Sequence, residues 1–156
     1  MKIFPPKPAS VQIYSLLHAR RHLSANLISG LEEKFGNETL KRSRRSAAEA
    51  LLDHQNLEDS EDVLDFFETV GLLNRLGALN DEMIHSTFFH WINLYWNAAA
   101  DYVAKRRAES TSVLWVDFQS LYKKTHALER LKDPLSKDLQ LSKEALTQYL
   151  NWELDV

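Results

Sequence analysis

The sequence predicts an all-helical protein, a single-domain bundle of about six helices around a central helical hairpin. Apolar residues recur at spacings of three and four along nearly the whole chain, which is the period of an amphipathic helix. Only four glycines and four prolines interrupt this pattern, and no stretch alternates apolar and polar residues as a strand does. With 156 residues, 44% of them hydrophobic, we expect an extended lead-in over residues 1–9 and one bundle domain over residues 10–156.

Two helices are predicted before the hairpin. Ser10 is a suitable N-cap for a first helix that reaches about Phe35, because serine side chains accept hydrogen bonds from the free amides of a first turn. Gly30 lies inside this helix and costs about 1 kcal/mol relative to alanine, so a break is expected there if the helix is interrupted. The second helix is predicted over residues 38–54.

The predicted central hairpin spans residues 60–107. Ser60 is expected to cap its first helix, and Gly77 is expected to end it, since glycine commonly terminates a helix in a left-handed conformation. Asn80 is expected to cap the second helix, and the short turn makes the two helices antiparallel neighbours. This second helix of the hairpin, which is predicted to reach Arg107, has apolar residues on two faces, so we expect it to lie at the centre of the bundle.

Two further helices are predicted after the hairpin. A cap between Ser110 and Ser112 is expected to start a helix that reaches about Leu131. Pro134 cannot continue a helix without the loss of a backbone hydrogen bond, so a loop is predicted around it. Ser142 is expected to cap a short last helix.

Three stretches of the sequence carry a family resemblance. They read RSRRSAAEALL, VLDFFETVGLLNRLGALNDEMIHSTFFHWINLYW and VLWVDFQSLY, and the most specific part is the Phe-Phe-Glu run followed by a glycine turn. Over roughly residues 35–125 the chain resembles a mostly bacterial group, the domain-of-unknown-function family 4760. The resemblance implies an all-helical fold and no particular activity. Some members carry N-terminal membrane segments, and we expect none in this chain.

Glu68 is a charged residue on a hairpin helix that has little surface left for water. A buried carboxylate needs hydrogen-bond donors, because its desolvation costs several kcal/mol. We therefore predict a structural buried ion pair between Glu68 and an arginine of the second predicted helix, with Arg42, Arg44 and Arg45 as the candidates. Arg75 is a further possible source. A catalytic role is the alternative, but no second carboxylate or nucleophile lies near Glu68 in the sequence, so we predict no enzyme.

The densest basic run is formed by Lys41, Arg42, Arg44 and Arg45. Such a run can hold nucleic-acid phosphates, but this one has no interleaved aromatic residues and spans only one or two turns. A solvated face or internal ion pairs is the preferred interpretation, and a nucleic-acid partner is not expected. A nucleic-acid-associated accessory protein that uses this basic helix remains the alternative function.

His18 and His22 lie four residues apart, a spacing found in zinc sites. No third ligand accompanies them in the sequence, and the neighbouring Arg20 and Arg21 disfavour a bound cation. We predict no metal site and no cofactor. The chain also has no cysteine, which fits a reducing cytoplasm. The polar stripe along the long hairpin helix argues against a membrane span, so we expect a cytoplasmic protein without membrane contact.

The aromatic residues of the long hairpin helix are expected to be core, with Trp91 or Trp96 left at the surface. Together with Trp152 they form the candidate partner surface. At about 1.5 Å per residue this helix would be about 40 Å long, and covering two apolar faces over that length predicts a homodimer. A monomer is the alternative. The predicted function is a non-enzymatic helical interaction module that self-associates, with a protein partner that the sequence does not identify.

Overall fold

The computed structural model describes residues 9–54 and 56–156, which contain seven α-helices, two short 3-10 helices and no strand. The predicted all-helical fold is confirmed. The predicted lead-in falls almost wholly outside the described residues, whereas Ala9, its last residue, is already helical. The elements are α1 (Ala9–Phe35), α2 (Glu38–Leu52), η1 (Glu58–Ser60), α3 (Asp62–Arg75), α4 (Asp81–Ala98), α5 (Ala100–Glu109), α6 (Val116–Lys132), η2 (Lys137–Leu139) and α7 (Lys143–Leu154).

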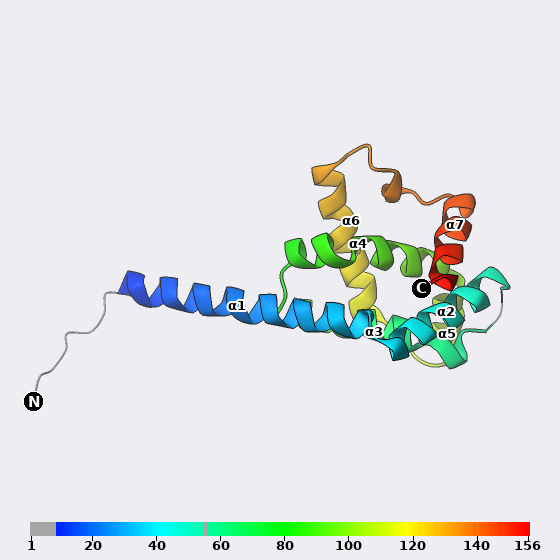
Figure 1. Ribbon diagram of the computed structural model, residues 1–156, viewed down its shortest axis with the longest axis horizontal. Helices are drawn as coiled ribbons and strands as arrows, with labels where there is room; N and C mark the ends of the chain where they lie inside the picture. The colour runs from blue at the N-terminus through cyan, green and yellow to red at the C-terminus, as the bar shows by residue number, and fades with distance from the viewer. Residues whose placement is uncertain (1–8, 55) are drawn as a thin grey trace, which may run out of the picture.

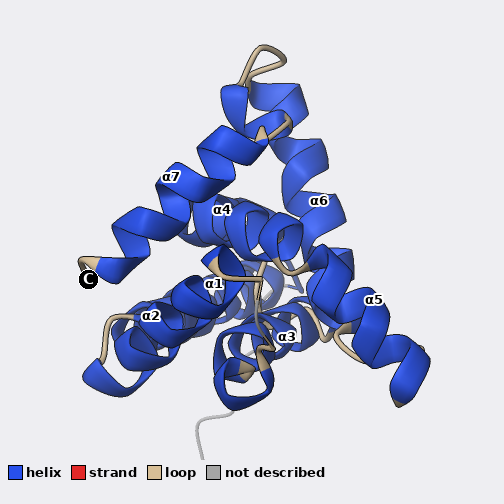
Figure 2. Ribbon diagram, turned by 90° about the vertical axis from the view of Figure 1, so that its right-hand side faces the viewer, coloured by secondary structure: helices blue, strands red, loops and turns tan. Residues whose placement is uncertain are grey.

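Three helices, α3, α4 and α6, form the centre of the domain. α6 crosses α3 and α4 and packs on each of them more extensively than they pack on one another (Figure 1). α7 returns from the end of α6 and lies against α2 and α4 (Figure 2). α6, which follows the predicted hairpin in the sequence, therefore packs against both of its helices, α3 and α4.

The core is rich in aromatic side chains contributed by four helices. Phe67 of α3 stacks on Phe118 of α6 with ring centroids 5.1 Å apart, and both rings are fully buried. Phe35, at the end of α1, lies 5.2 Å from Phe66 and 5.6 Å from Phe88 of α4. The C-terminal end of α1 is thereby anchored in the core, although its N-terminal half is not.

Several predicted helix ends are confirmed by their hydrogen bonds. Gly77 ends the α3 region with a left-handed φ of 74°, as expected for a terminating glycine. Asn80 caps α4, because its Oδ1 accepts a hydrogen bond of 2.8 Å from the Met83 amide. Ser142 caps α7 in the same way, accepting from the Ala145 amide at 3.2 Å.

The prediction of a single long helix from residue 81 to residue 107 is wrong, because the helix is interrupted at Ala99 and divides into α4 and α5. Just before the break, the Asn97 side-chain amide donates to the Asn93 carbonyl at 2.7 Å. A side chain that bonds to the backbone in this way competes with the helical hydrogen bond for the same carbonyl and favours a bend. α4 alone has 18 residues, so the length of this helix no longer supports a dimer.

Three predicted caps are also wrong, and the first of them, Ser10, already lies within α1. Ser60 ends the short helix η1, and Glu61 precedes α3 without a side-chain cap. The helix expected to start at residues 110–112 starts at Val116, because Trp115 adopts a left-handed φ of 52° and turns the chain. α1 continues through Gly30 without interruption.

Candidate functional site

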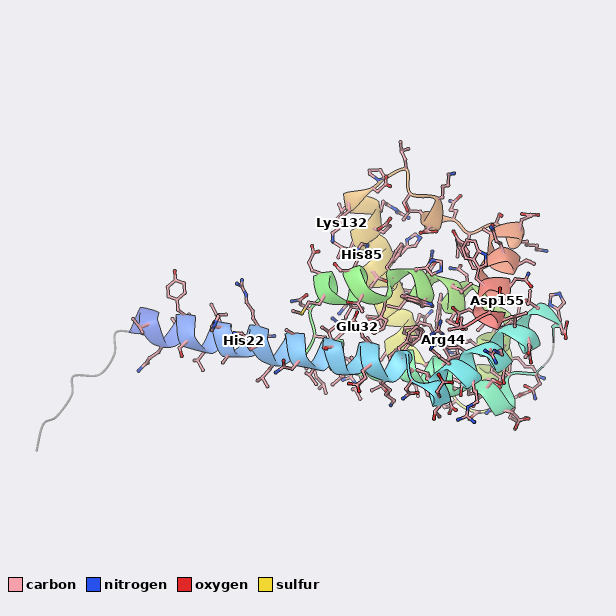
Figure 3. The ribbon with its side chains drawn as sticks, in the orientation of Figure 1. His22, Glu32, Arg44, His85, Lys132 and Asp155 are labelled. Carbon is pink, nitrogen blue, oxygen red and sulfur yellow. The ribbon has the colours of Figure 1, made fainter. Side chains whose placement is uncertain are left out.

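A buried polar cluster joins α2, α4 and α7, and we call it the Glu153 cluster. Arg44 of α2 donates two hydrogen bonds to the Glu153 carboxylate, at 2.6 and 2.7 Å, and the two side chains are only 5% and 7% exposed. The Tyr95 hydroxyl donates to the same carboxylate at 2.7 Å, and the Trp91 indole at 3.2 Å. Figure 3 labels Arg44 where α2 meets the C-terminal part of the chain. Four convergent donors make this carboxylate a structural anchor for α7.

The charge state of the cluster follows from its hydrogen bonds. Burial alone would raise the pKa of Glu153, but the hydrogen bonds from Arg44 and Tyr95 outweigh it and hold the pKa below its usual value. Burial, together with the adjacent Glu153 charge, raises the pKa of Tyr95 well above its usual value. Glu153 is therefore ionised at neutral pH, and Tyr95 stays a protonated donor.

The lowered pKa of Glu153 predicts a loss of stability in acid. A carboxyl group with a lowered folded-state pKa stabilises the protein above its unfolded value of about 4.3 and loses that contribution as pH falls through the folded value. The urea midpoint should fall as pH is lowered below about 4.3, and Glu153→Gln should make that fall shallower. Urea melts from pH 7 to pH 3 measure both slopes. Equal acid slopes in the two proteins would contradict this role of Glu153.

The predicted pairing of Glu68 with an arginine of the second helix is wrong. Glu68 is half-buried, and its Oε2 accepts a hydrogen bond of 2.7 Å from the Phe118 backbone amide. Phe118 lies in the first turn of α6, where amides have no partner within the helix and the preceding Trp115 supplies no side-chain cap. A carboxylate from α3 fills this need and also complements the helix dipole.

The three candidate arginines have separate roles. Arg44 belongs to the Glu153 cluster, and its guanidinium also lies 4.1 Å from the Phe35 ring centroid. Arg42 is exposed and donates to the Glu38 carbonyl of its own helix at 3.2 Å, while the exposed Arg45 donates to the carbonyl of Val156. The basic run is therefore not one continuous surface, since its central arginine is buried.

The three tryptophans of the predicted partner surface also differ. Trp91 is half-buried in the Glu153 cluster. Trp96 is half-buried too, with its ring centroid 5.1 Å from Phe118 and 5.9 Å from Tyr122. Only Trp152 among the three is largely exposed, at 54%. Two of the predicted surface tryptophans are thus engaged in the interior of the domain.

A different apolar surface lies on α1 (Figure 1). The N-terminal half of this helix extends past the other helices, which we call the body of the protein. Every residue from 11 to 23 is exposed, and Ser24 is the first buried residue after them. We call residues 11–23 the projecting segment. Its large apolar side chains are 44–75% exposed, and they are Val11, Ile13, Tyr14, Leu16, Leu17 and Leu23.

The projecting segment is fixed to the body at its C-terminal end. The Arg20 guanidinium donates to the Gly77 carbonyl at 2.8 Å, and the Ser24 hydroxyl donates to the Ala78 carbonyl at 2.7 Å. Both acceptors lie in the turn between α3 and α4. The contact sets the direction of the helix, while its preceding turns remain uncovered.

The histidine pair predicted not to bind a metal lies on this same segment. The His18 and His22 Nε2 atoms are 3.0 Å apart, and His22 lies on the part of α1 beyond the body (Figure 3). Across residues 9–54 and 56–156, no three His, Cys, Asp or Glu side chains are grouped as a metal site would require. In that same part of the chain, no helix has the length and apolar character needed to cross a membrane.

Neither Glu153 as the partner of Arg44 nor the exposure of α1 was predicted from the sequence. Glu153 lies three and four residues after Leu150 and Tyr149, on the apolar side of a short helix. An acid on that side was a signal for a buried pair. No sequence signal showed how far the other helices cover α1.

Comparison with known proteins gives a family but no characterised relative. Residues 10–125 match the family described as Domain of unknown function (DUF4760). This range contains all of α1 except Ala9 and three members of the Glu153 cluster, but not Glu153 itself. The comparisons with curated proteins and with solved structures gave no match to this chain. Because the match covers well over half of the sequence, the chain belongs to the DUF4760 family.

Proposed function

We propose that the protein is a non-enzymatic helical interaction module that self-associates through the projecting segment of α1. The observation that carries this proposal is the exposure of Ile13, Leu16 and Leu17, at 57%, 71% and 52%, on the part of α1 that the body does not cover. Soluble monomers rarely expose adjoining large apolar side chains, and such a patch commonly marks a contact with another protein. We also propose a cytoplasmic location, which the absence of cysteine supports.

This surface replaces the one that the sequence suggested. Trp91 and Trp96 are held in internal contacts, so they offer little area to a partner. Trp152 is exposed but stands beside Tyr149 on α7 without a comparable run of apolar neighbours. α1, in contrast, presents apolar side chains over more than three turns.

The nucleic-acid alternative has weaker support. Arg44 is buried against Glu153, which leaves Arg42 and Arg45 as the exposed arginines of the basic run. Affinity for nucleic acid rises with the number of neutralised phosphates, and two arginines on a short helix supply few contacts. We therefore prefer the interaction module.

The test changes the apolar surface without changing the body. In multi-angle light scattering, the wild-type mass should rise above the monomer mass of 18.1 kDa as concentration increases through tens to hundreds of micromolar. A Leu16→Glu/Leu17→Glu variant should stay at 18.1 kDa, because association would bury two carboxylates. Its stability should remain within about 0.5 kcal/mol of wild type, since both leucines are exposed.

Leu135→Glu provides the matched control, because Leu135 is 90% exposed but lies in the loop between α6 and α7. This variant should associate as the wild type does. A wild-type mass of 18.1 kDa at several hundred micromolar would refute self-association. Equal loss of association in both variants would refute the role of α1.

A further inference from the structure

We propose that two copies pair through antiparallel α1 helices that cross between Leu16 and Leu17. This inference rests on the proposed function, because it specifies the partner of the projecting segment and its direction. It follows from the spacing of the apolar side chains, the charge of the segment and the position of the body.

The apolar side chains form a self-complementary stripe. Leu16 and Leu17 lie three and four residues after Ile13, Arg20 lies four and three residues after them, and Leu23 follows Arg20 by three, so all five share one side of α1. A two-fold axis between Leu16 and Leu17 places Leu16 of each copy against Leu17 of the other. The same axis places Ile13 against the aliphatic part of Arg20, whose charged end is held at the Gly77 carbonyl. Each contact occurs twice, as a two-fold interface requires.

The charge of the segment disfavours parallel pairing. Residues 1–31 contain no Asp or Glu, and they carry Lys2, Lys7, Arg20 and Arg21. Parallel helices would place Arg20 of both copies at the same level, with no acidic residue of either segment to balance them. In the antiparallel pair the two Arg20 positions are about 10 Å apart along the helix axis. That separation exceeds the Debye length of about 8 Å at physiological salt, so the repulsion is largely screened.

The position of the body favours the same direction. The body begins where Arg20 and Ser24 contact the turn between α3 and α4, and only the preceding turns of α1 are free (Figure 1). Parallel pairing would bring two bodies to the same end of the helix pair. Antiparallel pairing puts them at opposite ends, and Leu23, still 64% exposed beside the body, lies open to the partner helix.

The length of the projecting segment limits the strength of the contact. Residues 11–23 form between three and four helical turns. Two segments of that length bury less surface than the roughly 1,600 Å² of a standard protein interface. We therefore expect a reversible dimer, with a dissociation constant in the micromolar range, rather than a permanent one.

The absence of cysteine in the chain makes spin labelling at single sites direct. Gln12→Cys, Ala19→Cys and Asn26→Cys place labels seven residues apart on exposed positions beside the apolar stripe. In the antiparallel dimer the two labels of a pair are offset along the axis by about 8 Å at position 19, about 14 Å at position 12 and about 28 Å at position 26. Double electron–electron resonance should give the shortest distance at position 19, a longer one at position 12 and the longest at position 26. Adding Leu16→Glu/Leu17→Glu should abolish all three dipolar signals.

The outcomes separate the two proposals. A dimer with the same distance at all three sites would be parallel and would overturn only this inference. A dimer with no α1 signal at positions 12 and 19 would overturn the α1 interface. A protein that stays at 18.1 kDa but sediments with vesicles of phosphatidylcholine and phosphatidylglycerol would overturn both proposals, because the cationic apolar helix would then serve a lipid surface.

Discussion

Gly71→Ala is expected to destabilise the protein by about 3 kcal/mol or more, at the upper end of what overpacking costs. A Cβ at this position would lie 2.3 Å from the Asp117 carbonyl oxygen and 2.5 Å from its carbonyl carbon. Both are backbone atoms, so neither can rotate away. α3 and α6 would have to separate at the point where Phe67 stacks on Phe118 and where Glu68 caps α6.

Urea denaturation measures the effect, and Gly30→Ala supplies the control. Gly30 also lies within a helix, but a Cβ there would meet no atom within 4 Å. The control should leave stability unchanged or raise it by up to about 1 kcal/mol, because alanine favours the helix. If Gly71→Ala stayed within about 0.5 kcal/mol of the wild type, the close approach of α3 and α6 would be incorrect.

Glu153→Ala is expected to cost about 3–5 kcal/mol, because it leaves a buried guanidinium without its counter-charge. The hydroxyl of Tyr95 and the indole of Trp91 lose their acceptor in the same change. Gln148→Ala on the same helix is the control, since Gln148 is exposed and its loss should cost less than about 0.5 kcal/mol.

A double variant separates the buried charge from simple loss of packing. Arg44→Met/Glu153→Leu removes both charges and keeps most of the volume, so it should recover much of the stability that Glu153→Ala loses. A double variant no more stable than Glu153→Ala would show that the hydrogen bonds from Tyr95 and Trp91 to Glu153, not the ion pair, dominate.

Local features of the fold were predictable from the sequence. Asn80 and Ser142 cap their helices because an N-cap acts on amides only two or three residues away. Gly77 ends α3 for an equally local reason, its left-handed backbone. The break at Ala99 was missed although its origin is also local. The apolar pattern continues through it, while the side chain of Asn97 bonds to the helix backbone.

The candidate site was less predictable, because its contacts join distant parts of the chain. The need of Glu68 for a donor was recognised, but the donor is a backbone amide, and periodic patterns of side chains do not reveal such partners. Arg44 needed a carboxylate, and its partner lies 109 residues later. The apolar stripe of α1 was visible in the sequence. Which part of it remains uncovered depends on how the other helices pack.

The long separation of Arg44 and Glu153 has a consequence for synthesis of the protein. Arg44 leaves the ribosome early, and synthesis must continue for 109 residues before its carboxylate partner has been made. At about 5–20 residues per second, that interval lasts about 5–20 s. Throughout it, the Arg44 guanidinium lacks its Glu153 partner, and α7 is not complete to pack against α2 and α4. We therefore expect the nascent chain to be most prone to misfolding before α7 has been made.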